Sequence, residues 1–356
     1  MPKKVAINGF GRIGRAAFKI LTNTPNPGSI ISPRLSGVEI EIVAINDLTP
    51  PETLAYLLKY DSVYGKAIVD VEGKSSEGKD YGGLRYNNKT IPVFHEKDPE
   101  NLPWAELGVD IVIESTGFFT NYEDAAKHIK AGAKKVVISA PSKSAENEFG
   151  RTLVIGTDKT TELIEGNLAP NVVSNASCTT NCISPVIQVI SNEFGIENAL
   201  MTTIHGYTST QNLVDGPNKN LRRARAAAEN IIPSTTGAAI ATTKVIDNLN
   251  NKFDGIAFRV PVPTGSVSDI TMLVSNDVSV EQINQVLINA SNEDRFQGIL
   301  TTTTEAIVST DIIGDYHSAI IDLELTKVVG RLVKVVAWYD NEWGYSNRLS
   351  EMVELI

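Results

Sequence analysis

The chain has 356 residues, of which 42% are hydrophobic, and its 32 basic and 42 acidic side chains give a net charge of −10. This length predicts two domains, and the acidic balance argues against nucleic-acid binding through the overall electrostatic field. The start, MPKKVAING, has no long apolar run and does not resemble a signal peptide, and no stretch approaches the roughly 18 apolar residues of a membrane span. We therefore expect a soluble, cytoplasmic protein.

Short strands alternate with helices in the first half of the chain. Strands are expected at 3–8, 38–47, 109–115 and 134–141, and helices at 14–23, 51–60 and 121–133. Near-continuous apolar strands that alternate with helices favour a parallel sheet covered on both faces. Two segments rich in turn residues, 24–37 and 72–83, are expected to be surface loops.

The second half has longer strands with alternating polarity. Strands are expected at 198–208, 252–264, 266–276, 318–326 and 331–340, and helices at 179–193, 237–248, 279–291 and 345–355. This pattern favours a mixed or antiparallel sheet in an α+β domain. The boundary between the two domains is expected near Asn175 to Cys178.

A glycine-rich turn follows the first expected strand. The segment INGFGRIGR places Gly9, Gly11 and Gly14 in the G-x-G-x-x-G spacing. The pattern alone is weak, but here it follows a strand, opens a helix and precedes a second strand that ends in an acid. Gly9 would make the turn, Gly11 would let a pyrophosphate approach the backbone, and Gly14 would let helix and strand pack closely. The free N–H groups of the helix start favour an anion, so a dinucleotide site is expected rather than a simple packing turn.

The acid that completes this pattern is Asp47, which lies 33 residues beyond Gly14 (47 − 14). The usual interval is about 20 residues, and the loop at 24–37 accounts for the excess. Asp47 would accept hydrogen bonds from the adenosine ribose. Its charge would repel a 2′-phosphate, so the sequence predicts NAD rather than NADP as cofactor.

Both cysteines of the chain lie in one segment, SNASCTTNCISP. A structural metal site needs about four Cys or His ligands, which this segment does not offer, and no metal is expected. A disulfide between Cys178 and Cys182 is not expected in a cytoplasmic chain. Cys178 falls at an expected strand-to-helix turn, where helix N–H groups stabilise a thiolate, and Cys182 falls one turn deeper. On these residues alone, a reactive Cys178 and two inert buried cysteines both stay open.

The four histidines differ in their expected settings. His128, on an amphipathic helix, and His95, in a loop, are expected to be solvated, and His317 precedes a strand. His205 ends a strand-like run, where it could act as a base toward a thiol or serve as a hydrogen-bonded edge residue.

Three arginines cluster in the segment NKNLRRARAAAEN. Arg222, Arg223 and Arg225 could form a solvated face or an anion pocket, since guanidinium groups suit phosphate. A nucleic-acid patch is not expected, because no aromatic residues are interleaved with these arginines.

Taken together, these segments resemble the phosphorylating glyceraldehyde-3-phosphate dehydrogenase family. The similarity runs from about Lys4 to the C-terminus. It is carried by INGFGRIGR, AINDL, LLKYDSVYG, STGFFT, AGAKKVVISAPSK, SNASCTTNC, DGPNKNLRRARAAAENIIPSTTGAA, RVPVPTGSVSD and WYDNEWGYSNR. The sequence departs from the common family pattern by an insertion at 24–37 and by an unusual segment at 144–171.

The resemblance implies a Rossmann-type NAD-binding domain at 1–177, completed by a C-terminal helix at 341–356. It also implies a catalytic domain at 178–340 with a mostly antiparallel sheet, and a homotetramer. The nucleophile would be Cys178 and the base His205. Cofactor contacts are implied for Asn8, Gly9, Phe10, Gly11, Arg12, Ile13, Asp47, Ser115, Thr116, Asn341 and Tyr345. The substrate phosphate would meet Thr208 and Arg259, and the attacking phosphate would meet Ser177, Thr179, Arg223, Thr236 and Gly237.

The implied reaction is the NAD-dependent oxidation of glyceraldehyde 3-phosphate through a Cys178 thioester, which inorganic phosphate then attacks. Two alternatives stay open at this point. One is an erythrose-4-phosphate dehydrogenase, a relative that acts on a longer aldehyde. The other is an NAD-binding regulator without catalysis, although such a protein need not keep the Cys178 and His205 pair and both phosphate sites.

Overall fold

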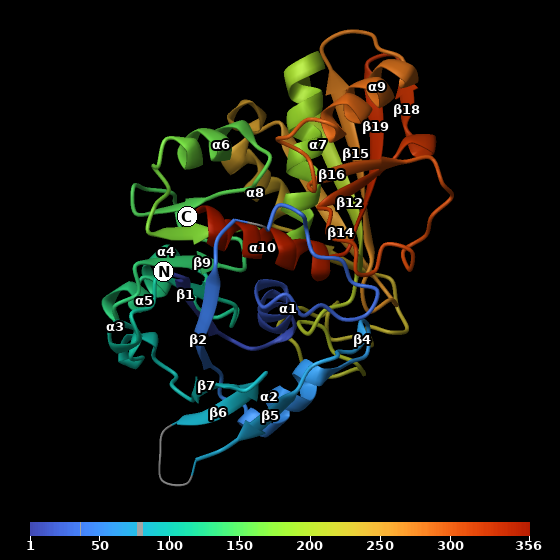
Figure 1. Ribbon diagram of the computed structural model, residues 1–356. Coiled ribbons are helices and arrows are strands. Elements are labelled where there is room, and N and C mark those ends of the chain that lie inside the picture. Colours follow the sequence, from blue (N-terminus) through green and yellow to red (C-terminus); the bar gives the residue numbers. More distant parts are fainter. Residues whose placement is uncertain (36, 77–80) are drawn as a thin grey trace. The chain divides into compact units, whose positions relative to one another are not determined.

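The computed structural model describes residues 1–35, 37–76 and 81–356 (Figure 1). The chain forms two compact units. The first comprises Met1–Leu153, Leu163–Ala176 and Ser346–Ile356, and the second comprises Val154–Glu162 and Ser177–Tyr345. The residues of two helices, α6 (Asp158–Glu165) and α10 (Trp343–Leu355), are divided between the two units.

The described part of the first unit contains a nine-stranded sheet in the order β10-β11-β9-β8-β1-β2-β7-β6-β5. Its strands are β1 (Lys3–Asn8), β2 (Ile40–Asn46), β5 (Val71–Lys74), β6 (Tyr81–Tyr86), β7 (Lys89–Phe94), β8 (Ile111–Glu114), β9 (Lys135–Ile138), β10 (Gly150–Thr152) and β11 (Val172–Ser174). A separate pair is formed by β3 (Tyr60–Asp61) and β4 (Gly65–Lys66). The helices are α1 (Arg12–Leu21), α2 (Pro51–Lys59), the 3₁₀ helix η1 (Pro99–Asn101), α3 (Trp104–Leu107), α4 (Tyr122–Ala125) and α5 (Lys127–Lys130).

Neighbouring strands from β10 to β7 run parallel, whereas β6 is antiparallel to both β7 and β5. The strand order reverses at β1, because the chain first builds outward through β2 and later returns with β8 on the other side of β1. Ligands of open parallel sheets bind at the carboxyl ends of the strands at such a reversal. Here that edge is formed by Asn8, the last residue of β1, with Gly9, and by Glu114, the last residue of β8, with Ser115.

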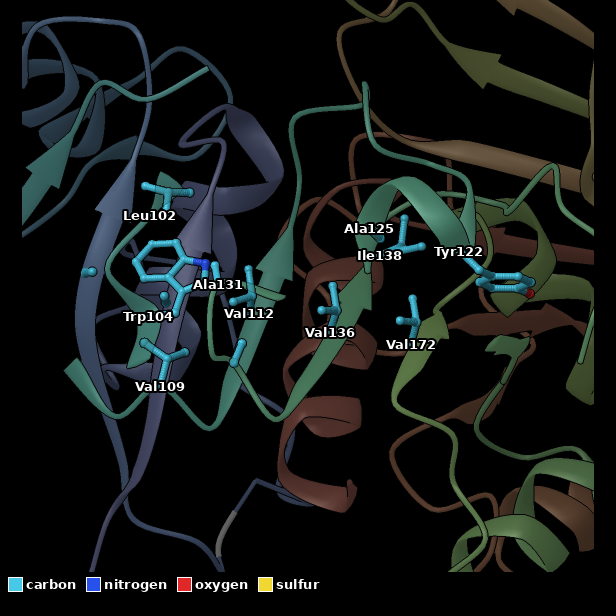
Figure 2. Close-up of a cluster of buried hydrophobic side chains, with 13 residues drawn as sticks. Leu102, Trp104, Val109, Val112, Tyr122, Ala125, Ala131, Val136, Ile138 and Val172 are labelled. Atoms are coloured by element: carbon cyan, nitrogen blue, oxygen red, sulfur yellow. The ribbon is translucent and has the colours of Figure 1, made fainter. Parts of the chain in front are cut away.

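Apolar side chains fill one face of this sheet (Figure 2). Ala6, Val112 and Val136 project from adjacent strands and are fully buried. Trp104 and Tyr122, from α3 and α4, cover them and are themselves fully buried. Residues of the opposite parity, such as Val5 and Ile7 of β1, are also fully buried. The strands are therefore apolar on both faces, which explains their continuous hydrophobic runs.

Two sequence-based expectations about the first unit were wrong. The segment 72–83 was expected to be a surface loop, but its described ends belong to the antiparallel pair β5 and β6, and residues 77–80 lie outside the described residues. The glycines and charged residues of this strand pair are typical of a loop, which explains the wrong expectation. The segment 121–133 was expected to be one helix, but it forms the two short helices α4 and α5, separated at Ala126.

The second unit contains a sheet in the order β13-β14-β12-β15-β19-β17-β16, with β18 beside β19. Its strands are β12 (Ile196–Gly206), β13 (Ile232–Thr235), β14 (Phe253–Val260), β15 (Ser266–Val274), β16 (Leu300–Thr303), β17 (Ala319–Asp322), β18 (Lys327–Val329) and β19 (Leu332–Tyr339). Its helices are α7 (Cys178–Phe194), α8 (Ala238–Val245), α9 (Val280–Ser291) and the 3₁₀ helices η2 (Asp247–Leu249) and η3 (Leu323–Leu325).

Most neighbouring strands of this second sheet are antiparallel; β12 with β14 and β16 with β17 are parallel. Strands β15 and β19 alternate between buried and partly exposed residues, as expected for a sheet with only one face in the core. A capping box between Ser279 and Gln282 fixes the start of α9. A mostly parallel first sheet and a mostly antiparallel second sheet confirm the expected fold class.

Over the ranges that the structure describes, no helix combines the length and the apolar character that a membrane crossing requires.

Candidate active site and cofactor site

Glycine stands at each of the three positions of the first turn for a different structural reason. Gly9 has a positive φ of 92°, and a Cβ there would lie 2.6 Å from the backbone nitrogen of Thr116. A Cβ on Gly14 would lie 2.2 Å from the carbonyl oxygen of Gly9. A Cβ on Gly11 would meet nothing within 4 Å. The fold therefore requires glycine at positions 9 and 14, whereas position 11 opens onto free space at the N-terminal end of α1, as a bound pyrophosphate requires.

Asp47 follows β2 directly and is held against this turn. Its Oδ2 accepts a hydrogen bond from the Phe10 N–H at 2.7 Å, and its Oδ1 accepts one from the Thr49 N–H at 2.9 Å. Each carboxylate oxygen keeps further lone pairs that can accept ribose hydroxyls. The turn and the acid are thus joined into one group, which fits the adenosine half of a dinucleotide.

Several residues expected to contact the cofactor also hold the protein together. Arg12 forms a two-point ion pair with Asp61, with both N–O distances 3.2 Å. The Ser115 hydroxyl donates to the Gly9 carbonyl at 2.6 Å. The Asn8 amide donates to Glu114 at 2.5 Å, and the Thr116 hydroxyl donates to the same carboxylate. These side chains shape the turn. That they also contact the cofactor directly stays a prediction.

A buried polar network supports the edge of the sheet. One Glu114 oxygen accepts from the Asn8 amide and lies 3.1 Å from His128 Nε2, while the other accepts from the Thr116 N–H at 2.9 Å. The Trp104 indole donates to His128 Nδ1 at 2.9 Å. Because Nδ1 accepts, the ring proton belongs on Nε2, where it can reach Glu114. The expectation that His128 is solvated was wrong, since its side chain is fully buried.

In the second unit, Cys178 is the first residue of α7. The Ser177 side chain caps the helix by accepting the Thr180 N–H at 3.1 Å. Cys182 lies one turn further and is fully buried, and both cysteines are free thiols. Across the described residues, no group of three or more His, Cys, Asp and Glu side chains could hold a metal ion.

Cys178 and His205 are brought together, with Cys178 Sγ 3.3 Å from His205 Nε2. His205 lies near the end of β12, and the parallel register of β12 with β14 places Arg259 beside it. Arg259 Nη1 lies 2.6 Å from His205 Nδ1. Burial, followed by the positive charge of Arg259, lowers the pKa of His205 to about 3, so the ring is neutral near neutral pH.

Cys178 is partly buried in the described structure, whereas Cys182 is fully buried. Burial raises the pKa of Cys178, while the Arg259 charge and hydrogen bonds at Thr179 act in the opposite direction. Burial also raises the pKa of Cys182, and the neighbouring Cys178 raises it further. A neutral thiol therefore faces a neutral imidazole in this site, and the helix start alone does not make Cys178 a thiolate.

The residues expected to bind phosphate lie at several places in this unit. The Arg223 guanidinium donates twice to the Ser234 hydroxyl, at 3.0 and 2.7 Å, and its charge lowers the pKa of Arg259 after the larger effect of burial. In contrast, Arg225 is exposed and pairs with Asp215. Thr208 bonds to Thr210, Thr236 accepts from the Ala238 N–H, and Gly237 is the N-cap of α8; over the described residues none of the three is hydrogen-bonded to either Arg223 or Arg259.

Asn341 is fixed in one orientation. Its Oδ1 accepts from the Ser266 hydroxyl at 2.8 Å, the Gly265 N–H at 3.1 Å and the Thr264 hydroxyl at 3.2 Å. The amide NH₂ is therefore the group left for a ligand, as recognition of a carboxamide oxygen requires. Tyr345 is buried one helical turn later.

Two supporting residues escaped the sequence analysis. The Tyr339 hydroxyl lies 2.9 Å from the Thr179 hydroxyl and 2.8 Å from that of Thr203, next to the thiol site. The Ser266 hydroxyl accepts from the Gly206 N–H at 3.2 Å and donates to Asn341. Both residues lie at the ends of strands whose sequences carry no motif. Only the pairing of these strands brings the two side chains to the site.

The fold and these residues define a class of protein. One unit carries a dinucleotide turn with its ribose acid, and the other carries a thiol and imidazole pair beside arginines. On one chain, these features define a nicotinamide-dependent dehydrogenase that uses a cysteine nucleophile.

Comparisons with known proteins identify the family. Residues 3–122 match the family described as glyceraldehyde 3-phosphate dehydrogenase, NAD binding domain, and residues 177–341 match its C-terminal domain. The glyceraldehyde-3-phosphate dehydrogenase of Mycobacterium avium is 49% identical over 357 residues, which cover 100% of this chain and 99% of that protein. Glyceraldehyde-3-phosphate dehydrogenase 2 of Streptomyces avermitilis is 48% identical over 360 residues with the same coverage. The chain belongs to the glyceraldehyde-3-phosphate dehydrogenase family, and the expected NAD-binding domain is confirmed.

Proposed function

We propose that this protein catalyses the NAD-dependent oxidative phosphorylation of D-glyceraldehyde 3-phosphate to 1,3-bisphosphoglycerate, a step of glycolysis and gluconeogenesis. The observation that carries this proposal is the 3.3 Å approach of Cys178 Sγ to His205 Nε2 in a chain of this family. A protein that only binds NAD would have no need to bury a thiol against a neutral imidazole.

The first chemical step forms a bond between Cys178 and the aldehyde carbon. The thiol proton passes to His205 Nε2 and then to the carbonyl oxygen, so the product is a neutral hemithioacetal. His205 next takes the hydroxyl proton while a hydride leaves the carbon, which gives a thioester. Bound NAD supplies the hydride acceptor. An oxygen of inorganic phosphate then attacks the thioester carbon, the carbon–sulfur bond breaks, and an acyl phosphate leaves.

The anion-binding side chains follow from this chemistry. In the proposal, the phosphate of the substrate is bound by Thr208 and Arg259. The attacking phosphate is bound by Ser177, Thr179, Arg223, Thr236 and Gly237. Guanidinium forks, hydroxyls and helix N-terminal amides are suited to phosphate oxygens, and Arg223 and Arg259 have no acidic partner within the described ranges.

The cofactor contacts are proposed at the sheet edge and at Asn341. Gly9, Phe10, Gly11, Arg12 and Ile13 would surround the pyrophosphate, and Asp47 would bind the adenosine ribose. Asn8, Ser115 and Thr116 would also contact the cofactor at this turn, and Asn341 with Tyr345 would hold the nicotinamide end. The same proposal assigns a role to each domain. Residues 1–177 with 341–356 would form the NAD-binding domain, and residues 178–340 would form the catalytic domain.

The proposed assembly is a homotetramer in the cytoplasm. Exposed apolar side chains gather on the second sheet and the helix α8, with Leu200 of β12 64% exposed, Leu332 of β19 46% exposed and Ile240 of α8 66% exposed. These residues line a shared surface groove with Phe253 and Leu273. An apolar surface of this kind supports burial against a second copy. Sedimentation of the purified protein and of Leu200→Asp would test this, and a monomeric parent protein would contradict it.

An NADH assay with glyceraldehyde 3-phosphate, inorganic phosphate and NAD tests the reaction. We expect NADH formation that needs phosphate for turnover and that stops after alkylation of the thiols. The same assay with erythrose 4-phosphate is the control for the related aldehyde, and a clearly higher rate with that substrate would overturn the proposed specificity. No NADH from either aldehyde would favour a purely binding role.

A further inference from the structure

The Ser266 hydroxyl joins two segments of the second unit that lie far apart in the sequence. Ser266 is the first residue of β15 and is 1% exposed. On one side, the Gly206 N–H at the end of β12 donates to Ser266 Oγ at 3.2 Å. On the other side, Ser266 pairs with Tyr339 at the end of β19, and Ser266 Oγ lies 2.8 Å from Oδ1 of Asn341, two residues further on. The hydroxyl therefore lies between a backbone donor and a side-chain amide.

Two donors decide which end of the Asn341 amide faces inward. The Gly265 N–H, 3.1 Å away, can only donate, so the Asn341 atom that faces it is the oxygen. In the opposite orientation, the NH₂ group would face this N–H. The buried Ser266 hydroxyl would then have no acceptor for its proton among the described residues. The hydroxyl and the backbone N–H therefore favour the same orientation of the amide.

The three donors to Asn341 are not equivalent. Gly265 has a φ of 88°, and a Cβ there would collide with a backbone carbonyl oxygen, so only glycine fits this position and its N–H is held in place. The Thr264 hydroxyl has one proton and two possible acceptors, Asn341 Oδ1 at 3.2 Å and Asp340 Oδ1 at 3.3 Å. The Ser266 hydroxyl is closer, and its proton has no second acceptor among the described residues. Ser266 is therefore the side chain that contributes most to the orientation of Asn341.

We propose that Ser266 is a positioning residue that sets which chemical group of the cofactor the site recognises. Asn341 is 5% exposed, and among the described residues no acceptor is paired with its Nδ2. With the oxygen held inward by Ser266, this NH₂ group donates to the ligand. The recognised group is then the carbonyl oxygen beside the pyridinium ring of the cofactor, and not its amide nitrogen. This inference rests on the proposed function, in which Asn341 holds the nicotinamide end.

A cofactor analogue separates the two orientations of the amide. 3-Acetylpyridine adenine dinucleotide keeps the carbonyl oxygen of NAD but has a methyl group where NAD has NH₂. An Asn341 NH₂ group held outward donates to either carbonyl oxygen. An Asn341 oxygen turned outward accepts from the NH₂ group of NAD, but the analogue offers it no donor. Loss of the Ser266 contact should therefore weaken binding of the analogue more than binding of NAD.

Equilibrium titrations of the purified protein measure this difference without any aldehyde. The ligands are NAD, the acetylpyridine analogue, and ADP-ribose, which lacks the pyridinium ring. In Ser266→Ala, the ratio of the Kd of the analogue to the Kd of NAD should rise by about 3- to 10-fold over the parent protein, as expected for one neutral hydrogen bond. The Kd of ADP-ribose should stay the same, because this ligand has no group for Asn341 to bind.

Two further variants distinguish positioning from general damage. Ser318→Ala removes another buried hydroxyl of the second unit, one without a hydrogen-bond partner among the described residues, and it should leave the Kd ratio unchanged. Thr264→Val keeps the shape of the side chain but removes the shared donor, so the ratio should rise by about 2-fold. Thr264→Val also tests the proposal if Ser266→Ala does not fold.

An unchanged Kd ratio in folded Ser266→Ala would overturn the proposal, as would an equal rise of the ratio in Ser318→Ala. If Ser266→Ala does not fold, an unchanged ratio in Thr264→Val has the same meaning. The proposed function is tested separately by the NADH assay. A parent protein that binds NAD but forms no NADH from glyceraldehyde 3-phosphate would contradict the proposed function without changing the result of the titrations.

Discussion

The sheet edge of the first unit and the thiol site of the second both bury polar groups, but they differ in how those groups are paired. At the sheet edge, Glu114 has donors on both oxygens, and His128 has a partner on each ring nitrogen. At the thiol site, His205 has two competing partners on one nitrogen, and among the described residues no acid pairs with Arg259.

This difference indicates that the sheet edge has a structural role and that the thiol site has a chemical one. A fully paired buried network is rigid, and it can hold a turn in the shape that a ligand needs. A site with a buried cation, a neutral base and a neutral thiol has hydrogen-bonding capacity left over, which a substrate with phosphate and carbonyl oxygens can use. Variants in the two regions should therefore fail in different ways.

The largest effect is expected for Cys178→Ser. NADH formation should fall by about 10⁴-fold or more, because the serine alkoxide is far harder to form than the thiolate. Steady-state assays and an equilibrium titration with NAD would measure this, and cofactor binding should stay near normal. The matched control is Cys182→Ser, which should be tolerated; a folded but inactive Cys182→Ser would show that the wrong cysteine was chosen.

A smaller effect is expected for Asp47→Ala. NAD binding should weaken by about 10- to 100-fold through loss of charged hydrogen bonds to the ribose, and discrimination against NADP should decrease. Asp47→Asn is the control, because it removes the charge but keeps one oxygen for the backbone N–H groups. Equilibrium titrations with both cofactors would show the ratio, and an unchanged ratio in both variants would rule out Asp47 as the ribose ligand.

Substitutions at the sheet edge should change the free energy of unfolding rather than the rate of the reaction. His128→Phe should cost about 1–3 kcal/mol of unfolding free energy, since it leaves the Trp104 N–H and one Glu114 oxygen short of a partner. The double variant His128→Phe, Trp104→Phe should cost less than the sum of the two single changes. Denaturant titrations would measure this, and strict additivity would show that the two side chains do not share a network.

The effect that is smallest near neutral pH concerns His205. Its pKa is about 3 in the folded protein and near 6.5 in the unfolded chain, so the unfolded chain binds more protons between these values. The contribution of His205 is therefore fully present above about pH 6.5 and is lost as the pH falls toward 3, by up to about 1.4 kcal/mol per pH unit. Relative to the parent protein, His205→Asn should gain stability as the pH falls. A pH-independent difference between the two would contradict the buried neutral ring.

Much of the fold was predictable because it depends on local patterns. Strand β1, the glycine turn and α1 follow from an apolar run, three glycines and a helix-forming segment in direct succession. The long strands of the second unit follow from their alternating polarity. The β5 and β6 pair was missed because its glycines and charged residues are typical of a loop, and its pairing depends on the neighbouring β7.

The sequence by itself determined the class of fold, the family and the residue types of the candidate site, since motifs such as SNASCTTNC and INGFGRIGR carry their chemistry in short segments. Only the tertiary structure decided the state of those residues. The burial that raises the pKa of Cys178 and the parallel pairing that sets Arg259 against His205 depend on contacts between distant segments. The same is true of His128, whose position on a helix suggested solvent and whose partners, Trp104 and Glu114, lie 24 and 14 residues away.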